Sequence, residues 1–194
     1  MKITRLFIGS VAALALSGCI SFGPKPPKTL LTLVPASMVT ANTARQAGPG
    51  QTVTILYPTA PAAISVTRVP VYDGNGTITY VKGVAWNDTP SHLFQNLMSE
   101  VVAAKTGKVV VDVRQYTIDP GTRISGQLIK FGIDAQAMQA VVIYDAILIR
   151  AGGTGIETRR FEARAPVESV DAGAGAALNV AANNVAVQVA GWVG

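Results

Sequence analysis

The chain contains only one cysteine, Cys19, and one histidine, His92, in 194 residues. A single cysteine excludes an intramolecular disulfide, so the stability of the fold must come from packing. Metal sites built from imidazole and thiolate need several such ligands, and no calcium-loop spacing of acidic residues is present. We therefore expect neither a metal ion nor a cofactor.

Charged residues are also scarce, at 14% of the sequence, whereas 49% of the residues are apolar. The formal net charge of +5 includes Lys2 and Arg5 in the first segment. Without these two, 14 basic and 11 acidic side chains remain, which leaves a charge of +3. Nucleic-acid binding requires a denser basic patch, so no nucleic-acid partner is expected. A chain of this length and apolar content can bury a core of ordinary size.

No nucleophile and base stand at a suitable spacing. Ser91 and His92 are neighbours in an expected helix, where adjacent side chains point about 100° apart. The acidic residues fall on separate expected strands and turns: Asp112, Asp119, Asp134, Asp145, Glu157, Glu162 and Glu168. Two of them could still meet in space as a glycosidase-like pair, but turns and solvated faces explain most of these positions. We expect that the protein is not an enzyme.

Residues 1–18 have the pattern of a bacterial signal peptide. Lys2 and Arg5 form a positive segment, and residues 6–16 form an apolar run that is too short to span a membrane as a helix. In a lipobox, small residues fit the signal peptidase and the cysteine thiol receives a diacylglycerol before cleavage. The run ends in such a motif, Leu16, Ser17, Gly18 and Cys19. Cys19 is the predicted lipid attachment site; the alternative is a plain secretory signal with a chance cysteine.

Residues 19–28 should then form a lipidated, proline-rich tether. The segment 21–28, SFGPKPPK, favours extended backbone. Each buried acyl methylene contributes about 0.8 kcal/mol, so two or three palmitate-length chains on Cys19 would hold the protein on a membrane. Ile20, rather than an aspartate, follows the cysteine. By similarity to lipoprotein sorting in Gram-negative bacteria, this favours the periplasmic face of the outer membrane.

Residues 29–194 should form a single domain, and its clearest element is a helix within residues 86–107. Asp88 or Thr89 can cap it, and Pro90 would occupy the first helical position, where a missing N–H costs nothing. Gly107 can end the helix in the left-handed conformation. The apolar residues recur at helical spacing and form one stripe: Leu93, Phe94, Leu97, Met98, Val101 and Val102.

The remaining pattern predicts strands in runs and a second, alanine-rich helix over residues 172–192. Expected strands cover residues 29–34, 52–57, 64–72, 77–84, 108–116, 123–133, 139–150 and 156–165. Pro70 should place its strand at an edge or beside a bulge, and strand 156–165 alternates as an edge strand with one wet face does. This order predicts an α+β fold, a mainly antiparallel sheet with two helices packed on one side, in two layers.

Two long segments resemble the ABC-type transport auxiliary lipoprotein family. Residues 68–112 read as a strand hairpin, Trp86, a proline-started helix and another strand. Residues 123–167 are similar to the closing strands of that family, with Arg159, Arg160 and Phe161 in the last of them, before an alanine-rich helix that ends near Trp192. The resemblance covers nearly all of the expected mature chain.

The resemblance implies an accessory or docking subunit of an ABC system for MCE-type lipid transport between the inner and outer membranes. Its partners would be an MCE-domain protein and the ABC permease and ATPase complex. The family has no catalytic motif, so only Cys19 carries over as a functional residue. The alternative is a structural or envelope-assembly lipoprotein that binds other envelope proteins without handling lipid; neighbouring genes would discriminate between the two.

Two helices are few for a sheet of about eight strands, and strand 139–150 is apolar on both faces apart from Asp145. Exposed apolar surface commonly marks a partner site. We therefore expect a homo-oligomer or contact with the MCE-domain protein, unless the sheet curls to cover itself.

Overall fold

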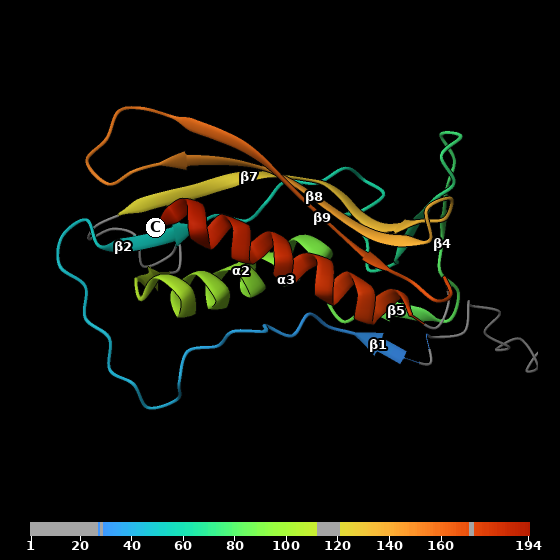
Figure 1. Cartoon of the computed structure of the whole chain (residues 1–194), viewed down its shortest axis with the longest axis horizontal. Coiled ribbons are helices and arrows are strands. Elements are labelled where there is room, and N and C mark those ends of the chain that lie inside the picture. Colours follow the sequence, from blue (N-terminus) through green and yellow to red (C-terminus); the bar gives the residue numbers. More distant parts are fainter. Residues whose placement is uncertain (1–26, 28, 112–120, 171–172) are drawn as a thin grey trace, which may run out of the picture.

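The computed structural model describes residues 27, 29–111, 121–170 and 173–194, and in this part of the chain a mixed β-sheet carries two helices on one face (Figure 1). The helices are α2 (Pro90–Thr106) and α3 (Ala174–Val193). The strands are β1 (Thr29–Leu31), β2 (Thr52–Ile55), β3 (Pro70–Tyr72), β4 (Ile78–Tyr80), β5 (Val84–Trp86), β6 (Val109–Val111), β7 (Thr122–Asp134), β8 (Gln139–Ile149) and β9 (Glu157–Pro166). The predicted α+β class is confirmed.

Strand β7 organises the main sheet. One of its edges pairs with β8 in antiparallel orientation, and β9 follows beyond β8. Two short strands share the other edge of β7, and both run parallel to it. Val53 of β2 lies opposite Thr122 of β7, and Val71 of β3 lies opposite Ile133 of β7. Strands joined directly by a turn pair antiparallel, as β3 does with β4, β7 with β8, and β8 with β9. Strands β2 and β3 are separated from β7 by long crossovers and pair with it in parallel.

Two local expectations differ from the structure, and a third is tested only in part. Strand β3 lies between β4 and β7, so the expected edge or bulge position of Pro70 is wrong. Pro70 is instead the first residue of its strand, where the missing N–H disturbs the sheet least. Residues 64–69, expected to be part of that strand, form turns and bends. Of the expected strand 108–116, β6 forms Val109–Val111, and residues 112–116 lie outside the described residues.

Helix α2 begins and ends where the sequence predicts. Thr89 is the N-cap residue, Pro90 opens the helix, and the N–H of Gly107, at φ 71°, donates to the Ala103 carbonyl. Its apolar stripe is buried, with no member more than 8% exposed: Leu93, Phe94, Leu97, Met98, Val101 and Val102. The Phe94 ring lies 5.4 Å from the Tyr144 ring of β8, which places this stripe against the centre of the sheet.

Helix α3 packs beside α2 over the same face of the sheet, and it contains no charged residue. Because its buried face is largely alanine, the helix lies close to β8 and β9. Near its end, the Trp192 ring lies 5.5 Å from the Phe161 ring of β9. In the described ranges, neither helix meets the length and hydropathy needed to cross a membrane.

The N-terminal segment adds a third layer. Strand β1 pairs in parallel with β5, and the extended chain that follows runs along the helices on the side away from β7 and β8 (Figure 1). We call residues 29–45 the strap. The sheet and the helices are the two layers that the sequence predicts. The strap is an additional layer that covers part of the outer surface of the helices.

Candidate functional site

The predicted lipid attachment site, Cys19, lies outside the described residues, as do the signal peptidase residues Leu16, Ser17 and Gly18. The structure describes residues 29–111 without a break, beginning ten positions after Cys19. Whatever holds the N-terminus therefore reaches the domain through the strap, so the contacts of the strap form the first candidate site.

Two asparagines of α3 hold the strap by its backbone. The Asn179 Oδ1 accepts from the Val34 N–H at 2.7 Å. The Asn183 Oδ1 accepts from the Ala36 N–H at 2.7 Å, and its Nδ2 donates to the Val34 carbonyl at 3.0 Å. Asn183 is only 6% exposed. Since a buried amide is stable only when it is paired, these contacts fix the strap to the helix.

Asn183→Ala should release the middle of the strap. The change leaves the Ala36 N–H and the Val34 carbonyl without their side-chain partner, and the expected loss of unfolding free energy is about 1–3 kcal/mol. Hydrogen exchange should become faster at Ala36, whose N–H loses its acceptor, while the amides of β8 keep their protection. The neighbouring, exposed Asn184→Ala is the matched control. Equal exchange in the two variants would mean that the strap does not depend on Asn183.

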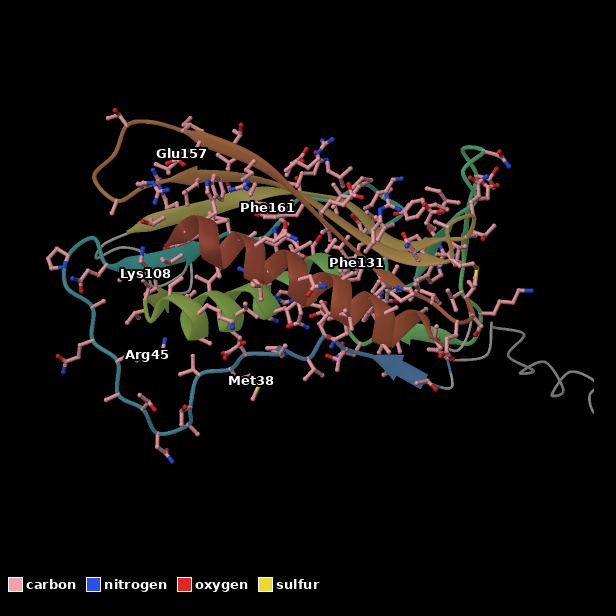
Figure 2. All side chains as sticks on the ribbon, viewed as in Figure 1. Met38, Arg45, Lys108, Phe131, Glu157 and Phe161 are labelled. Carbon is pink, nitrogen blue, oxygen red and sulfur yellow. The ribbon has the colours of Figure 1, made fainter. Side chains whose placement is uncertain are left out.

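Arg45 fixes the far end of the strap to the other helix. Its Nη1 donates to the Ala103 carbonyl of α2 at 2.8 Å and to the Lys108 carbonyl at 3.4 Å. Arg45 and Lys108 lie at the same end of the molecule, beyond Met38 along the strap (Figure 2). A cation at the C-terminal end of a helix is favoured by the helix dipole, which makes this a stable attachment point.

The strap and α3 together form an outer surface without charge, which we call the helix-side surface. Residues 29–44 and 174–193 contain no charged side chain. Large apolar side chains are exposed on it: Leu30, Val34, Met38, Val180 and Val187, at 62%, 55%, 63%, 51% and 42%. Grouped exposed apolar side chains usually mark a protein or membrane contact. The sequence indicated exposed apolar surface on strand 139–150, where only Ile147 among the large apolar side chains is exposed, at 37%; the more exposed apolar side chains lie on the strap and α3.

The opposite, open face of the sheet carries charge. Arg160 of β9 donates two hydrogen bonds to the Asp145 carboxylate of β8, both at 2.6 Å. These bonds lower the pKa of Asp145 and raise the pKa of Arg160. Because the folded-state pKa of Asp145 is depressed, the pair stabilises the fold above the ordinary aspartate range and loses this effect as the pH falls below it.

A shallow groove of about 900 Å³ lies on this open face, where the segment after β2 diverges from β7. Thr59 rejoins β7 by donating its N–H to the Gly126 carbonyl at 3.0 Å. A Cβ at Gly126 would overlap the Asp145 carbonyl, so glycine is required there. The lining is Leu56, Tyr57, Thr59, Ser125, Gly126, Gln127, Asp145, Ala146, Ile147, Thr158, Arg159 and Arg160. Asp145, the one carboxylate among these lining residues, is already paired with Arg160.

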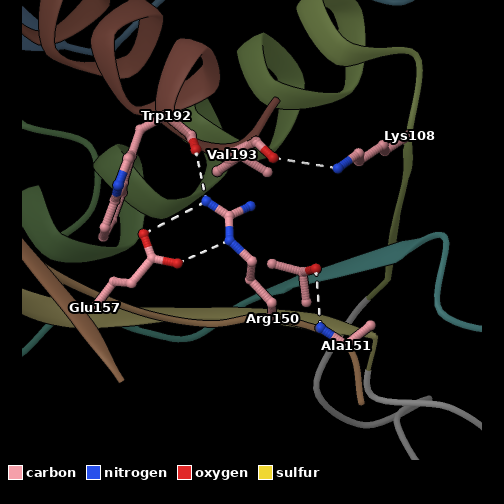
Figure 3. A network of polar contacts seen from close by, with 7 residues as sticks. Lys108, Arg150, Ala151, Glu157, Trp192 and Val193 are labelled. Carbon is pink, nitrogen blue, oxygen red and sulfur yellow. Dashed lines mark hydrogen bonds and ion pairs between the residues drawn. The ribbon is translucent and has the colours of Figure 1, made fainter. Parts of the chain in front are cut away.

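Two cations close the C-terminal end of α3 (Figure 3). Lys108 Nζ donates to the Val193 carbonyl at 3.2 Å, and Arg150 Nη2 donates to the Trp192 carbonyl at 3.5 Å. Arg150 also pairs with Glu157, with 2.8 Å between Nε and Oε1. Since carbonyls of the last turn have no partner within a helix, these contacts join α3 to the residue after β8 and to the residue before β6. They are structural contacts.

The described residues bring no catalytic group together at the positions that the sequence singled out. His92 Nδ1 lies 2.6 Å from Asp88 Oδ2, and Ser91 is buried at 3% exposed. His92 is therefore paired with Asp88, which lies just before α2, rather than with Ser91. In the same ranges, no group of three or more histidine, cysteine or acidic side chains is arranged to hold a metal ion. That the protein is not an enzyme stays a prediction.

Comparison with known proteins identifies the chain. The model of the family described as "ABC-type transport auxiliary lipoprotein component" matches residues 31–190. The chain belongs to this family. Members of the ABC-type transport auxiliary lipoprotein family are envelope lipoproteins that accompany an ABC transport system, so the resemblance drawn from the sequence is confirmed. Among curated proteins, none matches this sequence.

Two solved structures have a fold similar to that of this chain. The crystal structure of protein XCC0632 from Xanthomonas campestris, of family DUF330, has a TM-score of 0.62 at 19% identity and covers 86% of this chain and 91% of its own. A second crystal structure, described as an uncharacterized protein, has a TM-score of 0.61 at 11% identity and covers 77% and 94%. At these identities the comparisons support the fold alone.

Sequence reasoning did not find the strap contacts. A signal was present, because Asn179, Asn183, Asn184 and Gln188 share one side of the predicted helix. Asparagine is unfavourable in a helix interior, and repeated asparagines there indicate that side-chain amides bond to something outside the helix. The partner could not be named, because the strap is 145 or more positions away in the sequence.

Proposed function

We propose that the protein is an outer-membrane-anchored lipoprotein of the periplasm that acts as an accessory, docking subunit of an MCE-type ABC lipid transport system. Membership of the auxiliary lipoprotein family supports this proposal. The lipobox at Cys19 supplies the anchor, and Ile20 favours the outer membrane. The ATPase and permease that drive transport are separate chains.

The main support for a docking role is the uncharged helix-side surface, which lies where the expected tether enters the domain. Leu30 and Val34 of the strap are more than half exposed, and the adjacent Val180 of α3 is 51% exposed. Water disfavours this much grouped apolar area, while no charge has to be desolvated when a partner covers it. We assign the surface to the MCE-domain partner.

Site-specific photocrosslinking in the native envelope tests this assignment. A photoreactive residue at Val34, Met38 or Val180 should give a crosslink to the co-encoded MCE-domain protein. The same residue at Gln127 or Thr158, exposed on the open face of the sheet, is the matched control. Crosslinks from the control positions alone would place docking on the other face, and no crosslink from either set would contradict a docking subunit.

The second candidate is a structural envelope lipoprotein that handles no lipid. Its support is the same uncharged surface, which any envelope protein could cover. Deletion of the gene separates the two functions. An accessory subunit predicts the same change in outer-membrane lipid composition as deletion of the permease, whereas a structural lipoprotein predicts an unchanged composition.

A further inference from the structure

Strand β9 forms an edge of the main sheet, and one backbone hydrogen bond shows which of its residues bond to β8. Within the described residues it pairs only with β8. Just beyond its end, the Val167 N–H donates to the Met138 carbonyl, so the odd-numbered residues of β9 bond to β8. The even-numbered residues therefore direct their backbone groups outward. The Glu162 carbonyl is consistent with this pattern, because it accepts a hydrogen bond from the Gln188 side chain, 3.2 Å away, rather than from β8.

The side chains of these outward residues alternate in charge on the open face of the sheet. They are Thr158, Arg160, Glu162 and Arg164, and all four are exposed. If a second copy of β9 paired antiparallel about Phe161, Arg160 of each copy would lie directly opposite Glu162 of the other. We propose that β9 is a self-complementary edge through which two copies of this protein join their sheets.

Other registers are less favourable. If the two strands are centred on Glu162, the two Glu162 residues face each other and Arg160 of each copy faces Arg164 of the other. If they are centred on Arg160, the two Arg160 residues face each other. Like charges directly opposite one another destabilise a strand pair. A centre at Ala163 pairs Glu162 with Arg164, but it sets Pro166, which has no N–H, opposite Arg160. The register about Phe161 keeps Pro166 outside the paired segment.

The surroundings of β9 permit this contact. On the helix side, the same register sets Arg159 opposite Ala163 and Glu157 opposite Ala165, so no like charges meet. The adjacent helix α3 is uncharged. The Arg160 side chain is 63% exposed in its pair with Asp145, and the Glu162 side chain is 41% exposed in its pair with Arg164, so each can contact a second partner. Gln188 must release one exposed hydrogen bond. This inference does not depend on the lipid-transport role.

Charge reversal at two positions provides the test. In Arg160→Glu, two glutamates would face each other at both ends of the pair; in Glu162→Arg, two arginines would do so. Each variant should dissociate about tenfold or more readily than the natural chain. A mixed pair of the two variants restores both opposite-charge contacts. Full chains carrying two different affinity tags are co-expressed, captured through one tag in detergent, and probed for the other.

The expected result is strong co-capture for the natural pair and for the mixed pair, and weak co-capture for each variant with itself. Lys82→Glu, an exposed charge reversal between β4 and β5, is the matched control and should keep natural co-capture. Thermal unfolding of each variant checks its folding, and recovery in the mixed pair cannot arise from a folding defect. Equal capture in all combinations, or none in the natural pair, would overturn the proposal.

Discussion

Cys19→Ser should leave the precursor uncleaved after Gly18 and without lipid. The thiol of Cys19 is the predicted acceptor of the diacylglycerol, and the lipoprotein signal peptidase cleaves only after that group is attached. The sequence has no other cysteine to replace it. Intact-mass spectrometry should show a wild-type chain that starts at a lipidated Cys19 and a variant that retains residues 1–18.

A conservative change in the same motif provides the control. Ser17→Ala keeps a small side chain before the cleavage position, so processing and lipid attachment should proceed as in the natural chain. Membrane fractionation should then find the wild type and Ser17→Ala in the outer membrane. Cleavage of Cys19→Ser after Gly18, together with an unmodified Cys19 in the wild type, would show a plain secretory signal instead.

Leu97→Ala should destabilise the domain by about 2–5 kcal/mol, the usual range for truncation of a buried leucine. Leu97 is 1% exposed, on the stripe of α2 that packs against the sheet. Its removal loses apolar burial and leaves a cavity, because the close-packed side chains around it collapse only in part. Urea unfolding followed by circular dichroism measures the change through the midpoint and slope.

Leu30→Ala is the matched control for this experiment. It removes the same atoms from a leucine that is 62% exposed on the strap, and the expected change is within about 0.5 kcal/mol. A loss of similar size in both variants would point to an effect on the unfolded chain rather than on packing. No loss in either would mean that the stripe of α2 is not the core of the domain.

The elements with strong local signals were predicted well from the sequence. Pro90 and Gly107 mark the ends of α2 through backbone chemistry that depends only on those residues and their neighbours. The turn after Tyr72 is similar, because Asp73 Oδ1 accepts from the N–H groups of Asn75 and Thr77 and fixes the hairpin of β3 and β4. The alternation of β9 correctly predicted an edge strand with one wet face.

Long-range pairing could not be predicted in the same way. Nothing local to β2 or β3 indicates that both lie in parallel along one edge of β7, because that arrangement depends on the crossovers between them. The strap was also unpredictable as a layer. Its first residues have the composition of an ordinary strand, yet they pair with only three residues of β5 and then continue along α3 through side-chain amides.

The strap gives the domain a defined path for mechanical load. Any pull on the residues before Thr29 enters through the β1–β5 pairing, the amides of Asn179 and Asn183, and finally Arg45. A pull along the axis of the strap strains these bonds together, whereas a pull away from the helices breaks them one after another. The same protein therefore resists tension in one direction and yields in the other, and β5 passes the load directly to the start of α2.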